Sequence, residues 1–309
     1  MMVVVAGIFV LTFVLAHLAP GDPARDFAGE GADASQIEAA EVYLGLDRPL
    51  PEQFVVYVGR VVTGDLGTSY VQRQPVTTVI RLRLPPTLLL MGSALAVSSL
   101  AGVVLGLSTA RRPKSASAKA TSTLTMLAYS LPGFWLGQLM VITFAIRAGI
   151  LPAGGMNDAR EAYTGLAAVV DTARHLMLPV FVLALSETAL LARVTGSAVR
   201  RQVGANYMRT AAAKGLGRDE AFARHALPNA LLPVVTVIGG RLGFLVSGAV
   251  LIESVFAWPG LGRLLVEASR SNDHPVILGM VLMVSFAVVG ATLLTDLVYS
   301  RVDPRIRFR

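Results

Sequence analysis

Long apolar runs separated by polar segments dominate this chain. The runs lie at about 2–18, 86–110, 121–146, 176–193, 231–252 and 276–299. A transmembrane helix needs roughly 20 predominantly apolar residues, and these runs are close to that length or above it. The pattern therefore predicts an all-α polytopic membrane protein with six transmembrane helices.

The composition agrees with a surface that faces lipid. Of the 309 residues, 54% are hydrophobic and only 15% are charged, whereas about a quarter of the residues in a soluble domain are charged. The formal net charge is +7. Because the basic residues lie between the apolar runs rather than along one soluble face, we expect the lipid bilayer and no nucleic acid as a partner.

Basic residues are concentrated in alternate loops. The 111–120 loop holds cations and no acid, and both the 194–230 loop and the tail after Tyr299 are strongly basic. The 19–85 loop is instead rich in aspartate and glutamate. Because lysine and arginine collect on the cytoplasmic side of a membrane, we expect both termini and the 194–230 loop to face the cytoplasm.

The 19–85 loop carries helical signals of its own. The turn after Leu44–Asp47 and the helical spacing of the apolar residues in Phe54–Val62 predict a small helical cap. We therefore divide the chain into a first transmembrane helix at 1–19, an extracytoplasmic helical cap at 20–75, a five-helix transmembrane domain at 76–299 and a cytoplasmic tail at 300–309.

The 194–230 loop is too long to be a simple connection. Ala205–Lys214 is rich in helix formers and is followed by Gly215, a helix stop. A second short helix can begin near Asp219, and we expect it to end before Pro228. An apolar stripe lies on the first helix at Tyr207, Met208 and Ala211. Such helices either pack on the chain's own cytoplasmic ends or lie in a groove of a partner.

Three ionisable residues lie in or near the predicted membrane helices: Glu187, Arg241 and Glu253. A charge at mid-membrane costs about 2.5–3.5 kcal/mol on insertion scales, so these side chains should face a pathway or a partner. Arg241 either pairs with Glu187 or lines a translocation path where substrate carboxylates pass. Glu253 can cap the outer end of its own helix.

The sequence lacks the motifs of an enzyme or a metal protein. It contains no cysteine, no His-Glu-x-x-His and no Gly-x-Ser-x-Gly, and its four histidines, His17, His175, His225 and His274, are scattered. It also lacks a Gly-x-x-x-x-Gly-Lys-Ser/Thr phosphate loop. We therefore expect no metal, no cofactor and no catalytic role. A self-sufficient secondary transporter usually shows matching halves, and none is visible.

Asn206–Gly217 followed by Arg224–Ala230 resembles the "EAA" coupling loop of ABC importer permeases. Gly215, Leu227 and Pro228 fall on the family spacing, and Ala211 takes the place of the second alanine. Arg209 and Thr210 replace the glutamate and the first alanine, and His225 replaces the isoleucine. These replacements are similar to the form in the dipeptide and oligopeptide permease branch.

Further motifs of that branch occur in order along the whole chain. They are Leu18–Pro23, Gly45–Pro49, Gly64–Ser69, Leu84–Leu88, Leu131–Trp135 and Glu253–Gly262. Relatives usually carry basic residues before the first span, whereas this chain opens with apolar ones, which leaves open a native start upstream of Met1.

The resemblance implies the architecture of a type I ABC importer permease in the bacterial inner membrane. It also implies a heterodimer with a second homologous permease, two ATP-binding subunits that hold ATP and Mg, and an extracytoplasmic substrate-binding protein. The implied cargo is a di- or oligopeptide, with nickel, glutathione or haem as alternatives. The rival class is an ATP-independent secondary transporter.

The resemblance also assigns roles to residues. The coupling loop would be about 197–230, with contacts to the ATPase from Tyr207, Met208, Arg209, Ala211, Lys214, Gly215, Leu227 and Pro228. Arg209 and Lys214 would reach acidic groups on the ATPase rim. Small residues recur at intervals of four at Gly239, Gly243 and Ser247, a ridge that lets helices approach closely in lipid. That ridge would pack on the partner permease or inside this chain.

Overall fold

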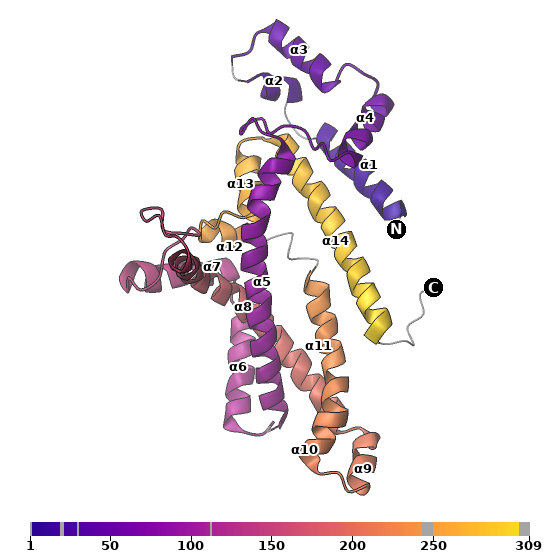
Figure 1. The fold of residues 1–309 in the computed structure, drawn as a ribbon, viewed down its shortest axis with the longest axis vertical. Coiled ribbons are helices and arrows are strands. Elements are labelled where there is room, and N and C mark those ends of the chain that lie inside the picture. Colours follow the sequence, from indigo (N-terminus) through magenta and orange to yellow (C-terminus); the bar gives the residue numbers. More distant parts are fainter. Residues whose placement is uncertain (1, 19–21, 30, 112, 243–249, 303–309) are drawn as a thin grey trace.

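The computed structural model describes residues 2–18, 22–29, 31–111, 113–242 and 250–302 (Figure 1). Within these ranges all the regular elements are helices, apart from one isolated antiparallel bridge between Thr68 and Pro75. The predicted all-α class is confirmed. Figure 1 shows an elongated molecule, with α2 and α3 at one end of the long axis and α9 and α10 at the other.

The chain begins with α1 and three short helices of the predicted cap. These are α1 (Met2–Leu18), α2 (Pro23–Ala28), α3 (Ala34–Leu44) and α4 (Leu50–Val62). Asp33 and Gln36 form a capping box at the start of α3, and Gly45 ends it with a φ of +74°. α4 packs on α1 through a 2.7 Å hydrogen bond between Tyr57 Oη and Thr12 Oγ1. The helix end at Leu44 and the helix over Phe54–Val62 are as predicted.

The segment between α4 and α5 is tied to the start of the last helix. The carboxylate of Asp273 is buried and accepts hydrogen bonds from Ser69 Oγ and from the backbone N–H of Tyr70. Burial, with the negative charges of Asp26 and Asp273, raises the pKa of Tyr70 to about 12. The Gly64–Ser69 motif therefore helps to fix this turn against the start of α14.

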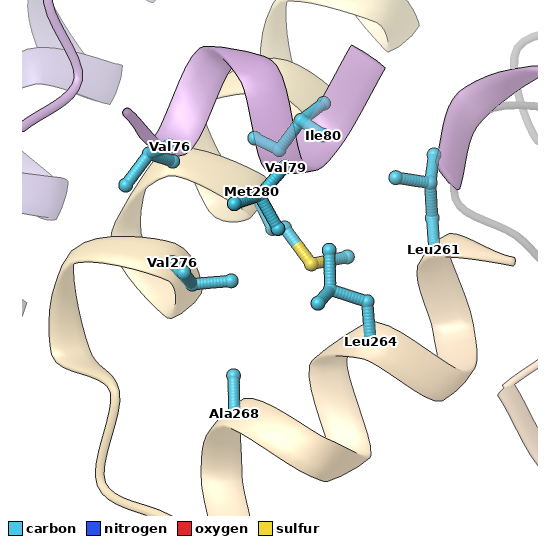
Figure 2. Packing of buried hydrophobic residues seen from close by; sticks show 8 residues of the cluster. All are labelled: Val76, Val79, Ile80, Leu261, Leu264, Ala268, Val276 and Met280. Atoms are coloured by element: carbon cyan, nitrogen blue, oxygen red, sulfur yellow. The ribbon is translucent and has the colours of Figure 1, made fainter. Parts of the chain in front are cut away.

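α5 (Val76–Arg111) starts well before the predicted boundary at residue 86, and contains Pro85 and Pro86. Prolines normally interrupt a helix. Here the first turns of α5 are held by burial against α13 and α14, in a cluster of Val76, Val79, Ile80, Leu261, Leu264, Ala268, Val276 and Met280 (Figure 2). α8 (Leu166–Val203) also extends beyond its predicted limits of 176–193 at both ends, and it makes the most extensive helix–helix contact of the described chain with α5.

The third apolar run, predicted as a span at 121–146, is not a single regular helix. The structure has α6 (Ala116–Ser130), α7 (Gly133–Met140) and a π-helix, η1 (Val141–Arg147), and the chain bends by 100° between α6 and α7. Leu131 is extended, with φ −84° and ψ 132°, because the residue before a proline is driven out of the helical region. Pro132 then precedes the first residue of α7.

The segment after α8 contains α9 (Asn206–Ala213), α10 (Arg218–Ala221), the π-helix η2 (Phe222–Ala226) and α11 (Leu227–Leu242). The prediction that the second helix ends before Pro228 is wrong, because Arg218–Arg241 is continuously helical. In a regular α-helix the proline ring would clash with the carbonyl four residues earlier. The wider turn of η2, which ends two residues before Pro228, accommodates the ring.

The last elements are α12 (Val250–Val255), α13 (Leu261–Arg270) and α14 (His274–Val302). Within the described ranges, four helical stretches are long and apolar enough to span a membrane, in α5, α8, Arg218–Arg241 and α14. The bent α6–α7 pair would add a fifth if it counts as one span, and α1 is apolar but shorter. The count of six spans remains a prediction.

Candidate functional site

The helix predicted within Ala205–Lys214 is present as α9, at the end of the molecule far from the cap (Figure 1). It ends in a Schellman motif: Leu216 N–H donates to Ala211 O and Gly215 N–H donates to Ala212 O. Gly215 has a φ of +86°, and a Cβ added to it would meet no neighbouring atom within 4 Å. Glycine is therefore required at this position by the left-handed backbone conformation and not by crowding from neighbouring atoms.

The side chains of this segment divide into an inner and an outer set. Ala211 is buried and Met208 is half-buried, whereas Tyr207 is exposed and donates a 2.7 Å hydrogen bond to Gln202 Oε1 of α8. Arg209 and Lys214 are exposed, and no carboxylate of the described chain lies within ion-pair distance of either. Leu227 is half-buried and Pro228 is exposed. The exposed cations are thus available to an acidic partner surface.

The intramembrane charges Glu187 and Arg241 are brought together. Arg241 Nε of α11 lies 3.2 Å from Glu187 Oε2 of α8, with both side chains about one-third exposed (39% and 32%). That oxygen accepts no hydrogen bond from the described residues, so the contact is an ion pair without hydrogen-bond alignment. Of the two alternatives for Arg241, the pair is present in the structure, and pathway lining stays a hypothesis.

We expect Arg241→Gln to destabilise the protein, because it leaves Glu187 without its cation in a membrane helix. An unpaired charge there costs about 2.5–3.5 kcal/mol on insertion scales. Adding Glu187→Gln should recover most of the loss, and thermal unfolding of the two single variants and the double variant measures the coupling. A stable Arg241→Gln protein that has lost uptake would instead identify Arg241 as a pathway residue.

The third charge, Glu253, is fully buried and does not cap its own helix. Its Oε2 accepts a 3.0 Å hydrogen bond from Arg263 N–H in the first turn of α13, and its Oε1 accepts a 2.8 Å bond from Thr87 Oγ1 of α5. The same hydroxyl accepts a 2.8 Å bond from Leu261 N–H. Glu253 therefore caps the next helix, where the positive end of the helix dipole favours a carboxylate.

This site joins two of the predicted motifs, Leu84–Leu88 and Glu253–Gly262. The indole Nε1 of Trp258 donates a 2.9 Å hydrogen bond to Pro86 O, directly beside Thr87. A Cβ on Gly260 would overlap the Glu253 carboxylate, so this close approach requires glycine. The two motifs are far apart in sequence and form one buried hydrogen-bonded junction between α5, α12 and α13.

Residues that the sequence interpretation missed lie between α5 and α8. A Cβ on Gly102 would lie 2.5 Å from Leu191 Cβ, and one on Gly106 would overlap Thr195 Cβ and lie 2.8 Å from Ala192 O. The signal was present, since Gly-x-x-x-Gly in an apolar run is a helix-packing motif. Of the predicted ridge, Gly239 lies in α11, and Gly243 and Ser247 fall outside the described residues.

Long apolar helices, a charge pair between two of them and a basic helical hairpin of α9 and α10 at one end are the features of a polytopic membrane protein. The chain belongs to the family of binding-protein-dependent transport system inner membrane components. The family's sequence profile matches residues 102–308, and the profile of the N-terminal region of such membrane components matches residues 1–91. The predicted family is confirmed, as is the prediction of a transport permease.

The chain is similar over nearly its whole length to named permeases. It is 40% identical over 302 residues to a protein named as a peptide permease in Brucella ovis, a match that covers 96% of this chain and 93% of that one. It is 39% identical over 302 residues to the glutathione transport system permease protein GsiC of Pectobacterium atrosepticum, covering 98% and 94%.

Two solved structures share the fold. One shows inward-facing conformations of the MetNI methionine ABC transporter, with a TM-score of 0.54 and 18% identity over 73% of this chain and 96% of that one. The other is an amino acid ABC transporter with histidines, with a TM-score of 0.52 and 16% identity, covering 73% and 94%. The described helices are therefore arranged in the same fold as these two transporter chains.

Proposed function

We propose that this chain is a permease subunit of an ATP-driven importer for di- or oligopeptides in the bacterial inner membrane. It forms half of the translocation path beside a second, homologous permease. The observation that carries the proposal is the near-full-length match to relatives named for peptide and glutathione transport. Glutathione is itself a tripeptide, so it is the favoured alternative cargo within the same machinery.

The partners follow from the family and from the surface of α9. Two ATP-binding subunits bind ATP and Mg and contact α9, while an extracytoplasmic binding protein delivers the cargo at the cap. The basic loops at 111–120 and 194–230 support this orientation, because they carry the excess of lysine and arginine that marks a cytoplasmic face. Exposed Arg209 and Lys214 would pair with acidic groups on the ATPase rim.

We expect Gly215→Val to uncouple the permease from its ATPase. A β-branched residue in the left-handed region costs roughly 1–2 kcal/mol, and the end of α9 can relieve that strain only by changing its angle. ATP-driven peptide uptake should fall by about 5- to 30-fold, because a free-energy cost of roughly 1–2 kcal/mol changes an equilibrium by that factor. The amount of ATPase recovered in a pull-down should fall by the same factor. Gly217→Ala is the matched control, since Gly217 has a φ of −61° and should behave as wild type.

The wild-type pull-down from mild detergent tests the function itself. Recovery of a second permease, an ATPase and a lipid-anchored binding protein supports an importer subunit, and that binding protein can be screened with peptides and glutathione. Recovery of the chain alone, with transport in proteoliposomes that needs no ATP, would overturn the proposal in favour of a secondary transporter. Equal uptake by Gly215→Val and wild type would refute only the role of the hairpin.

A further inference from the structure

A cavity of about 460 Å³ lies between the C-terminal ends of α5 and α8 and the 118–126 part of α6. Its α6 wall presents three hydroxyl groups, from Thr121, Ser122 and Thr125. Its α8 wall presents the arginines Arg193 and Arg200. Among the residues that the structure describes, no acidic one lines the cavity. The volume is in the range of ligand sites, which run from about 300 to 1,000 Å³.

The two guanidinium groups have no anionic partner within the described chain. Arg193 lies over the ring of Tyr129, with its Cζ 5.6 Å from the ring centroid. The side chain of Arg200 folds back along α8 and passes over Gly196: its Nη1 would lie only 3.3 Å from a Cβ added to that glycine. Seven residues separate the arginines, which is two turns, or about 10.5 Å along one helix face. Two cations and a row of hydroxyl donors therefore share one cavity.

The surroundings of the cavity match the cytoplasmic side of a membrane. The 111–120 loop, which contributes Pro113 to the lining, carries several cations and no acid. Met126 lines the cavity and is 67% exposed, and its neighbours Leu124 and Leu127 on α6 are also exposed. A basic pocket between membrane helices on this side is the type of site that binds anionic lipid headgroups.

We propose that this cavity binds the phosphate of an anionic glycerophospholipid from the inner leaflet, such as cardiolipin or phosphatidylglycerol. The guanidinium groups pair with phosphate oxygens and the α6 hydroxyls donate to them, as charge-assisted hydrogen bonds. The acyl chains lie along the exposed apolar side chains of α6. The site depends on the cytoplasmic orientation given under the proposed function, but it does not depend on the cargo.

The test compares lipids on the purified importer complex. Thermal unfolding is followed in phosphatidylcholine vesicles alone, with added cardiolipin, and with added inorganic phosphate, and mass spectrometry counts the anionic lipid retained after detergent washing. Cardiolipin should raise the unfolding temperature of the wild type, and inorganic phosphate should not. In Arg193→Gln/Arg200→Gln, retained anionic lipid should fall roughly tenfold, the loss expected when charge-assisted contacts are removed.

Arg201→Gln is the matched control, because Arg201 is exposed next to Arg200 but does not line the cavity. It should retain lipid as the wild type does. Ser122→Trp is the second variant, since it fills the cavity from an exposed position and leaves both arginines in place; it should also lose the lipid. If all variants retained as much anionic lipid as the wild type, the proposal would be overturned. If inorganic phosphate raised the unfolding temperature as much as cardiolipin does, the ligand would be free phosphate and not a lipid. Lipid retention is measured without transport, so its failure is distinct from failure of peptide import.

Discussion

Replacing Gly106 with leucine is expected to prevent the protein from reaching its folded state in the membrane. A Cβ at this position would overlap Thr195 Cβ and lie 2.8 Å from the backbone oxygen of Ala192. A backbone atom cannot move aside as a side chain can, so α5 and α8 would have to separate. Overpacking typically costs 1–3 kcal/mol even where side chains can adjust, and here the rest of a leucine follows the Cβ into the same contact.

The measurement is the yield and thermal unfolding of the variant after extraction in mild detergent. Gly106→Ala should give a smaller but clear decrease in unfolding temperature, because it adds only the Cβ. Gly92→Leu is the matched control on the same helix, since nothing lies within 4 Å of a Cβ added there. Normal stability of Gly106→Leu would contradict the close packing of α5 on α8.

Much of the fold could be predicted from residues that act locally. Gly45 and Gly215 both end helices with a positive φ. Gly215 is predictable because a glycine after a run of helix formers is a strong stop signal, and the helix end at Leu44–Asp47 is predictable from its glycine and the prolines that follow. The helix over Phe54–Val62 followed from the spacing of its apolar residues. These signals depend only on neighbours a few residues away.

The mistaken boundaries lie at prolines, where local rules compete with packing and with π-turns. The apolar run that begins at residue 86 predicted a helix start beside Pro85 and Pro86, but burial of Val76 and Val79 against α13 and α14 extends α5 to before them. Pro228 suggested a helix end, but η2 precedes it and the helix continues. Pro132 does mark a break, and the long apolar run concealed it. Whether a proline ends a helix depends on distant contacts that one sequence does not display.

The same limit applies to the candidate sites. The pair of Glu187 with Arg241 could be proposed because few charges occur in the apolar runs. The partner of Glu253 could not, because Thr87 and the backbone of Arg263 carry no charge that marks them as its partners. Such a carboxylate is recognisable from sequence only as a charge that must be satisfied.

Replacing Glu253 with alanine is the other change from which we expect a large effect. It leaves the buried hydroxyl of Thr87 and the partly buried N–H of Arg263 without their acceptor. Each unsatisfied buried group costs about 1–3 kcal/mol, and α13 also loses the carboxylate at its N-terminal end. The unfolding temperature should fall by more than it does for a substitution at an exposed position, because the junction of α5, α12 and α13 is buried.

Thr87→Val identifies the hydrogen bonds as the cause. Valine keeps the shape of threonine but removes the hydroxyl, which both donates to Glu253 and accepts from Leu261 N–H. The double variant should be less destabilised than the sum of the two single variants, since both remove one shared bond. Glu267→Gln is the control: its ion pairs with Arg83 and Arg263 are partly exposed, and such pairs contribute about 0–1 kcal/mol. If Glu253→Ala were no more destabilising than Glu267→Gln, the carboxylate would not be holding the start of α13.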